Sequence, residues 1–232
     1  MATTFASIKA DVLSLLNALV ATTAATAQTG YTNAVAGTVV SVSTDWPEGL
    51  VEAAILDAEY TVCYEIAMNP RHPERADFEE LSGALASGAT LPTSSANSKN
   101  YIGPFSAVID GTSSTVLQER PLAIVVMASE NEATMFPTKG NIYAIAGGKI
   151  FYDATNQIKL TGPALNKSTF TGNIRCRDIY RPAIVAGAMT YLLAKEGAWA
   201  DAWQMQSKLW GEWLGYIRSV GRQTAVPMPS QV

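Results

Sequence analysis

Residues 194–213 read AKEGAWADAWQMQSKLWGEW and hold four of the chain's five tryptophans. The four are Trp199, Trp203, Trp210 and Trp213, and their intervals of 4, 7 and 3 residues are helical spacings. At about 100° per residue, these indoles and Ile217 fall within an arc of roughly 80°. The sequence therefore predicts an amphipathic helix over 198–220, with a narrow aromatic stripe that packs on the protein's own core or on another subunit.

The sequence pattern also predicts the structure of the segments on either side of this helix. Tyr180-Arg-Pro182 precedes AIVAGAMTYLLAKEG, which predicts a long helix, and Gly197 is expected to separate the two helices. Residues 221–232, GRQTAVPMPSQV, show no periodicity and are expected to form an extended tail. Such a segment gains order only by docking on a partner, and simple fraying is the alternative.

The first part of the chain is also predicted to be helical. Apolar residues recur at helical spacing over residues 4–26, which predicts a first helix. A second helix is expected to begin near Trp46, where Pro47 suits the first turn, and to end at NPRHP over 69–73 because two prolines break the ladder. ERADFEELSGALA at 74–86 predicts a short third helix, followed by a loop.

The middle of the chain changes to strand patterns. Residues 105–165 contain FSAVID, LAIVVMA, NIYAIAGGKIFYD and NQIKLTG, which are predicted as strands. The third piece predicts a β-hairpin, because Gly147-Gly148 adopts positive φ at low cost between two β-rich runs.

Together these patterns predict an α+β fold. Its core is an antiparallel helical bundle of N- and C-terminal helices, with an inserted small β region and an extended C-terminal tail. The expected segments are 1–104 for the first helices and loop, 105–165 for the β insert, 166–220 for the closing helices and 221–232 for the tail.

Composition restricts the classes of function. The formal net charge is −4 and only 16% of residues are charged, so the chain is a poor candidate for gripping duplex DNA. No apolar run is long enough to cross a membrane. The N-terminus shows a helical stripe rather than a solid apolar block, which favours a cytoplasmic start over a secretory signal. Cys63 and Cys176 lie far apart in the sequence and fit a reducing compartment.

The sequence offers no strong pointer to catalysis. His72, the only histidine, lies in an Arg-His-Pro turn with no nucleophile signature nearby, so an exposed turn residue or a helix cap is expected. No metal-ligand spacing and no phosphate-binding glycine motif occur, so neither a metal nor a cofactor is predicted. Glu48 and Glu52 share a helix face, which is most simply a solvated or pore-facing surface. An enzyme is therefore not favoured.

Three segments resemble the head-to-tail connector proteins of tailed bacteriophages, also called adaptors or head-completion proteins, especially the short-tailed phage type. They are LVEAAILDAEYTVCYEIAMNP running into RHPERADF, then ASGATLP followed by IGPFSAVI. The third is the hairpin NIYAIAGGKIFYD with the later RPAIVAGAMTYLLAKEGAWADAWQMQSKLWGEWLGYI. The resemblance covers most of residues 45–220.

The resemblance implies a structural role in the virion, after assembly in the host cytoplasm. Connectors form a ring, usually of twelve copies, that joins the portal protein to the tail nozzle or tail tube and extends the DNA channel. DNA passes through without sequence-specific binding. The resemblance implies that the C-terminal tail docks on the portal, through Val226, Pro227, Met228, Pro229 and Val232. It also implies that the β hairpin faces the tail, through Ile142, Tyr143, Gly147, Gly148, Phe151 and Tyr152.

Two alternatives stay open at this point. One is another phage tail or baseplate protein that uses the β region for attachment. The other is an intracellular enzyme or ligand-binding domain with a pocket between helices and sheet.

Overall fold

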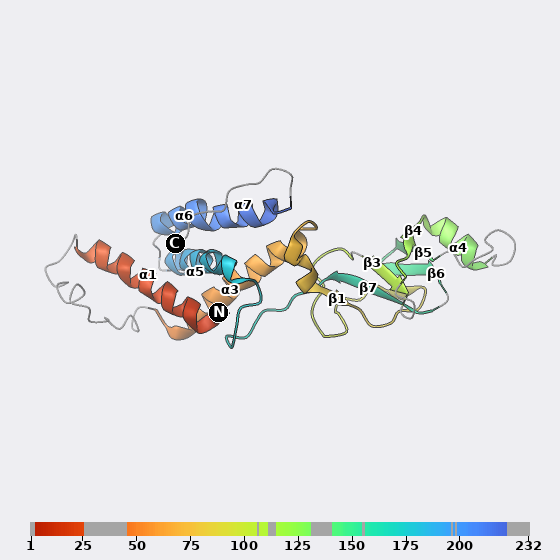
Figure 1. Ribbon diagram of the computed structural model, residues 1–232, viewed down its shortest axis with the longest axis horizontal. Helices are drawn as coiled ribbons and strands as arrows, with labels where there is room; N and C mark the ends of the chain where they lie inside the picture. Colours follow the sequence, from red (N-terminus) through yellow and green to blue (C-terminus); the bar gives the residue numbers. More distant parts are fainter. Residues whose placement is uncertain are drawn as a thin grey trace. The chain divides into compact units, whose positions relative to one another are not determined.

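A computed structural model describes residues 3–25, 46–105, 107–110, 115–130, 141–154, 156–195, 197 and 199–221. The fold is α+β and the chain divides into two compact units (Figure 1). The helical unit comprises Met1–Pro73 and Lys167–Val232, and the inserted unit comprises Glu74–Asn166. The insertion therefore begins at Glu74, well before the predicted β region at 105.

The helical unit is built on two long buried helices. α3 (Glu48–Met68) packs along α5 (Arg181–Lys195), and α1 (Phe5–Ala25) lies against both. Pro47 stands one residue before α3, and its carbonyl oxygen accepts the N–H groups of Leu50 and Val51. The proline therefore precedes the helix instead of lying in its first turn. The predicted first, second and long C-terminal helices are confirmed.

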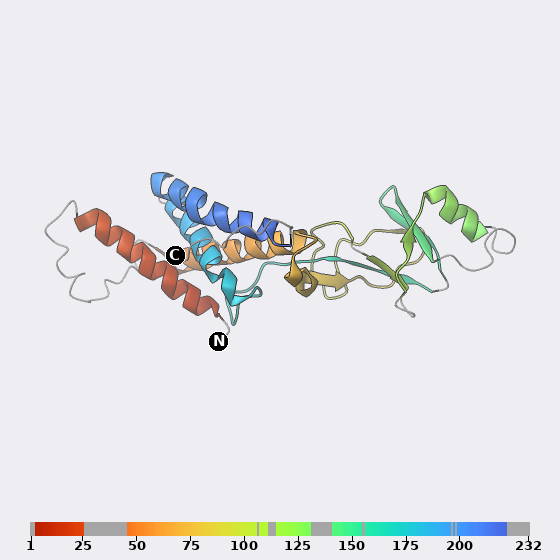
Figure 2. The same ribbon diagram turned by 45° about the horizontal axis from the view of Figure 1, so that its top comes forward.

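The C-terminal helix contains an irregular turn that the sequence reading missed. α6 (Trp199–Met205) and α7 (Gly211–Ser219) are joined by a π-helical turn over Gln206–Trp210, and the three form one continuous rod (Figure 2). Gly197 separates this rod from α5 with φ of +81°, as predicted. A π turn closes i→i+5 hydrogen bonds, so it holds one residue more than an α turn and shifts the helical phase by about 100°.

The end of α3 is tied to the end of this rod. Asn69 caps α3 in an extended conformation, with its backbone N–H donating to Glu65 and Ile66. Its side-chain amide donates to the carbonyl oxygens of Ile217 at 2.9 Å and Val220 at 3.0 Å. One side chain therefore satisfies carbonyl groups that the end of α7 would otherwise leave without partners.

The inserted unit holds two small sheets. One has the strand order β1-β7-β3 and the other β2-β6-β5-β4, and all pairs are antiparallel except β4 with β5. The strands are β1 (Glu79–Leu81), β2 (Ala89–Thr90), β3 (Ala107–Asp110), β4 (Gln118–Glu119), β5 (Ile142–Ala146), β6 (Lys149–Asp153) and β7 (Ile158–Pro163). The predicted hairpin is confirmed as β5 and β6, with φ of +56° at Gly147 and +71° at Gly148.

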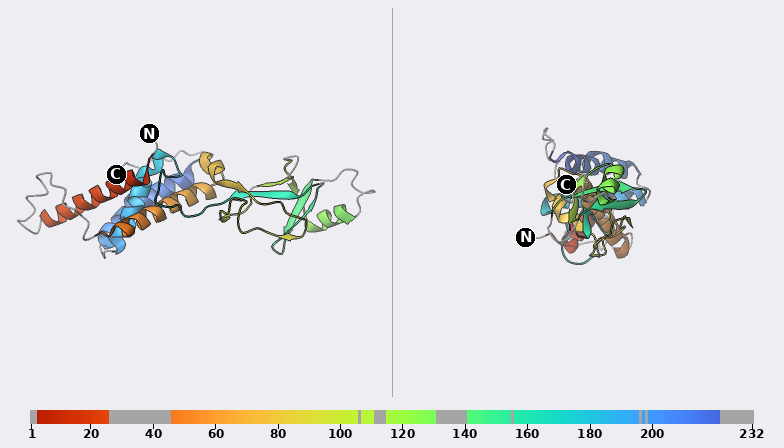
Figure 3. Two further views of the ribbon diagram at one scale, coloured as in Figure 1. Left: turned by 90° about the horizontal axis from the view of Figure 1, so that it is seen from below. Right: turned by 90° about the vertical axis from the view of Figure 1, so that its right-hand side faces the viewer.

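Two predictions in this unit are wrong. Residues 74–86 were expected to form a helix, but a short 3₁₀ helix (Pro73–Phe78) leads directly into β1, which pairs with β7. The piece LAIVVMA was expected to be a strand, but it lies in α4 (Leu122–Glu130), which packs on β5 and β6 (Figure 3). In both places a long-range sheet contact, rather than local periodicity, decides the structure.

Candidate interaction surfaces

The predicted tryptophan stripe is divided between the core and the surface. Trp210, Trp213 and Ile217 are buried, and Trp213 and Ile217 retain no exposed surface. Trp203, by contrast, is 69% exposed. The π turn between Trp203 and Trp210 explains the difference, because its extra residue turns α6 out of phase with α7. The side chain of Trp199 lies outside the described residues.

Trp210, in the buried half of the stripe, packs closely against Gly187 in the helical core. A Cβ at Gly187 of α5 would lie 2.7 Å and 2.8 Å from two ring atoms of Trp210, and 2.9 Å from Cβ of Ala58 in α3. The absence of a side chain at Gly187 therefore lets the indole reach the contact between α3 and α5. The prediction of a packing seam holds for Trp210, Trp213 and Ile217, and does not hold for Trp203.

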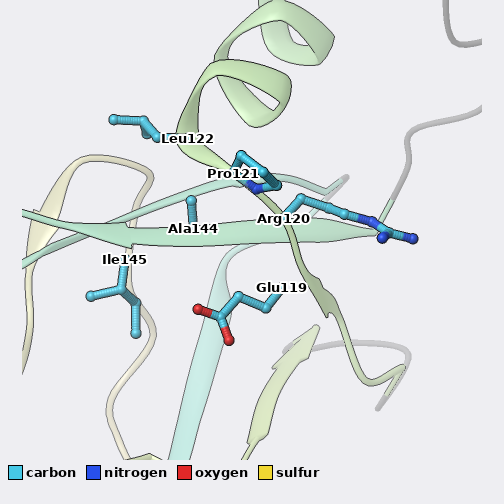
Figure 4. Close-up of a pocket in the computed structure, with 6 residues that line it drawn as sticks. All are labelled: Glu119, Arg120, Pro121, Leu122, Ala144 and Ile145. Atoms are coloured by element: carbon cyan, nitrogen blue, oxygen red, sulfur yellow. The ribbon is translucent and has the colours of Figure 1, made fainter.

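The inserted unit also has an exposed apolar surface. α4 buries Val125 and Ala128 against the sheet, yet its other faces carry Leu122, Ile124 and Met127 at 36%, 39% and 46% exposure. Ile145 of β5 is 40% exposed. A helix that is apolar on all faces is typical of one buried on all sides. We name Leu122, Ile124 and Met127 the α4 surface. Ile145 is not part of it, because Ala144, its neighbour on the opposite face of β5, is the residue that packs under α4 (Figure 4).

A shallow groove of about 410 Å³ runs beside the start of α4. It is lined by Glu119, Arg120, Pro121, Leu122, Ala144 and Ile145 (Figure 4). Figure 4 shows the side chains of Ala144 and Ile145 on opposite faces of β5, with Glu119 on the side of Ile145. The groove combines an apolar wall with one acidic and one basic residue, which suits contact with a polypeptide better than a bound metal or phosphate.

The predicted hairpin residues contribute mainly to the core of the inserted unit. Ile142 is buried, and Phe151 packs with it against α4. Tyr143 and Tyr152 pack on the cluster around Ile150, and the Tyr152 hydroxyl donates to the Leu85 carbonyl at 3.0 Å. Of the predicted hairpin residues, Gly147 and Gly148 of the turn are the exposed ones.

Sequence reasoning missed the α4 surface because it assigned LAIVVMA to a strand. Pro121, which directly precedes this apolar segment, was the available signal, because proline favours the start of a helix. With a helix assigned, the absence of a polar face would have identified the surface.

A buried carboxylate organises the middle of the helical unit. Glu59 of α3 is fully buried. It accepts hydrogen bonds from the Arg175 backbone N–H at 3.2 Å, Arg175 Nε at 2.9 Å, Arg175 Nη2 at 2.6 Å and Ser168 Oγ at 3.2 Å. The Cys63 thiol donates to it at 3.6 Å. Because these donors satisfy the carboxylate, Glu59 fixes the segment before α5 and offers no free acid or base.

His72 is buried rather than exposed, which corrects the sequence-based expectation. It is 4% exposed, and its Nε2 lies 2.9 Å from the Tyr180 hydroxyl. Burial lowers the pKa of His72, and the neighbouring Arg177 lowers it further. The imidazole therefore links the turn after α3 to the start of α5 in its neutral form.

The predicted tail residues Val226, Pro227, Met228, Pro229 and Val232 lie outside the described residues. Within the described part of the chain, no three His, Cys, Asp or Glu side chains are grouped so as to hold a metal ion. No described helix is long and apolar enough to span a bilayer.

No protein-family model matches the chain, and no curated protein matches its sequence.

Proposed function

We propose that the chain is a virion structural protein that forms a ring, usually of twelve copies in the family it resembles, between the portal and the tail of a bacteriophage. The α4 surface carries the proposal. After α4 has packed on β5 and β6, these three apolar side chains remain exposed, and an exposed apolar patch marks a candidate site for a protein partner. We assign this surface, with the adjoining hairpin turn, to the tail nozzle or tail tube protein.

The helical unit supplies the ring in this proposal. We take its helices as the antiparallel bundle expected from the sequence, and a closed ring needs two different lateral faces on each subunit. Among the described side chains of this unit, Trp203 on α6 is the largest exposed apolar one, and we assign it to one of those faces. Tryptophan is among the residues that contribute most to binding at interfaces.

The net charge fits a channel that DNA passes through. A subunit with a formal charge of −4 repels phosphate within a Debye length of about 8–10 Å, so the duplex slides without being gripped. The C-terminal tail, with Val226, Pro227, Met228, Pro229 and Val232, extends onto the portal in this proposal, as it does in the family that the chain resembles.

The test is reconstitution with the two partners. The full chain is mixed with the portal protein encoded near it, followed by size exclusion with light scattering and electron microscopy of the peak. We expect a ring stacked on the portal. Deleting residues 222–232 should abolish the complex, and replacing them with a Gly/Ser segment of equal length tests whether sequence or length matters.

The tail-side contact is tested separately, on the assembled ring. Changing Leu122 and Met127 together to Ser should prevent binding of the tail protein while portal binding persists. Leu81→Ser, which alters another exposed apolar residue of the inserted unit, is the matched control. A chain that ignores the portal and stays monomeric would contradict the connector proposal, and a threefold or sixfold assembly would favour a baseplate protein.

A further inference from the structure

One cysteine contacts the buried carboxylate of Glu59, and a second, distant in the sequence, follows the residue that binds the same carboxylate. The Cys63 thiol donates to Glu59 Oε1 at 3.6 Å, and the backbone N–H of Arg175 donates to the same oxygen at 3.2 Å. Cys176 is the next residue, and a side-chain hydrogen bond between Cys176 and Cys63 is the main cause of the raised pKa of the Cys63 thiol. Both cysteines are free and buried. The fold therefore brings together a pair of thiols that the sequence separates by residues 64–175.

The two thiols sit on backbone of different kinds. Cys63 lies within α3, on the face that also buries Val62 and Ile66. Cys176 lies in an irregular segment that is held by side-chain contacts and by the hydrogen bond from Ile174 N–H to the Thr3 carbonyl. An irregular segment adjusts its backbone at lower cost than a helix, so Cys176 is the partner that moves to reach disulfide geometry.

We infer that Cys63 and Cys176 form an intramolecular disulfide when the chain meets an oxidant of the small-molecule disulfide class, such as oxidised glutathione, and remain a dithiol in reducing surroundings. One cysteine thiolate attacks the oxidant's S–S bond, forming a mixed disulfide and releasing one reduced glutathione. The second cysteine attacks the cysteine sulfur of that mixed disulfide and releases the second. The two cysteines are oxidised, one glutathione disulfide is reduced, and both thiol protons leave on the products.

The environment makes this reaction slow in the native fold. The hydrogen bond with Cys176 and burial both raise the pKa of Cys63, so its thiolate is scarce at neutral pH. The oxidant also reaches the pair only when the segment around Cys176 opens. The dithiol therefore survives brief exposure to an oxidant, and the crosslink accumulates over prolonged exposure.

The position of the crosslink determines its effect. Cys63 precedes the inserted unit Glu74–Asn166 and Cys176 follows it, so the disulfide closes a loop that contains the whole insertion. Closing a long loop restricts the unfolded chain most. We expect the oxidised chain to unfold about 5–15 °C above the reduced chain. The inference is independent of the connector role.

The experiment incubates the full folded chain with oxidised glutathione at mildly alkaline pH. We expect an intact mass lower by two hydrogen atoms, a Cys63–Cys176 peptide pair in a non-reducing digest, and the higher unfolding temperature. Cys63→Ser and Cys176→Ser should each gain only a glutathione adduct, with no such rise. The same incubation of the urea-unfolded chain is the control, because it measures how long glutathione disulfide takes to oxidise accessible thiols.

Two results would overturn the inference. One is that both thiols remain free in the folded chain long after the urea-unfolded chain is fully oxidised. The other is that the folded chain collects only glutathione adducts or intermolecular disulfides, which would mean that the two sulfurs cannot reach bonding geometry.

Discussion

At Gly187, helix propensity and side-chain packing act in opposite directions. It lies inside α5, where replacing glycine by alanine normally stabilises a helix by about 0.8–1.0 kcal/mol. In this fold the new Cβ would lie 2.7–2.8 Å from the Trp210 ring and 2.9 Å from Cβ of Ala58. Ordinary carbon contacts lie at about 3.5–4.0 Å, so the indole or α3 must move.

The free-energy cost of the steric contact at Gly187 follows from comparison with a second helical glycine. Gly215 is helical and exposed in α7, and a Cβ there would meet nothing within 4 Å. Gly215→Ala should therefore stabilise the chain by about 0.5–1 kcal/mol. Gly187→Ala gains a similar propensity term but adds an overpacking cost of about 1–3 kcal/mol. The propensity terms cancel in the difference between the two variants, which leaves about 1–3 kcal/mol for the steric contact.

The assay is urea unfolding of both variants and the parent chain. Circular dichroism is the appropriate signal, because changes near Trp210 would alter fluorescence by themselves. We expect Gly187→Ala to be the less stable variant, and Trp210→Leu to remove most of its cost in a double-mutant cycle. Equal free energies of unfolding for the two alanine variants, within about 0.5 kcal/mol, would refute the close approach of Trp210 to α5.

Three further predictions concern the same unit. Trp213→Ala should cost about 3–5 kcal/mol of unfolding free energy, whereas Trp203→Ala should change it by less than about 0.5 kcal/mol, both by urea titration. Glu59→Gln should lower the free energy of unfolding by about 3 kcal/mol. This is the low end for a broken buried ion pair, because the Arg175 side chain is still 30% exposed. An unchanged urea midpoint would contradict this. Burial lowers the pKa of His72 from 6.5, so the unfolded chain takes up its proton first and stability is lost as pH falls below 6.5. Melting temperatures at pH about 7.5 and 5.5 should therefore diverge more for the parent than for His72→Gln.

The elements that the sequence predicts correctly are those with strong local signals. α3 and α5 are long periodic helices bounded by proline, and the β5–β6 hairpin has a Gly-Gly turn between β-rich runs. Each of these signals lies within the element that it specifies. The same holds for Gly197, whose positive φ ends the helix before it.

The elements that escape prediction depend on distant partners. β1 exists because its residues Glu79–Leu81 pair with β7, some eighty residues later in the chain. α4 is a short β-branched run that suits either a strand or a helix, and its contact with β5 and β6 favours the helix. Glu59, Cys63 and His72 likewise acquire their partners from the segment before and at the start of α5, which no spacing in the sequence indicates.

The extra residue in the turn Gln206–Trp210 rotates α6 about the helix axis relative to α7. α7 is oriented by its packing on the core. α6 is rotated by one residue relative to α7, so the two halves of the helix direct the same side of the sequence pattern in different directions. An ordinary α-helix of the same length would have directed Trp203 to the same side as Trp213. One inserted residue thus transfers a tryptophan from internal packing to external contact without changing any side chain.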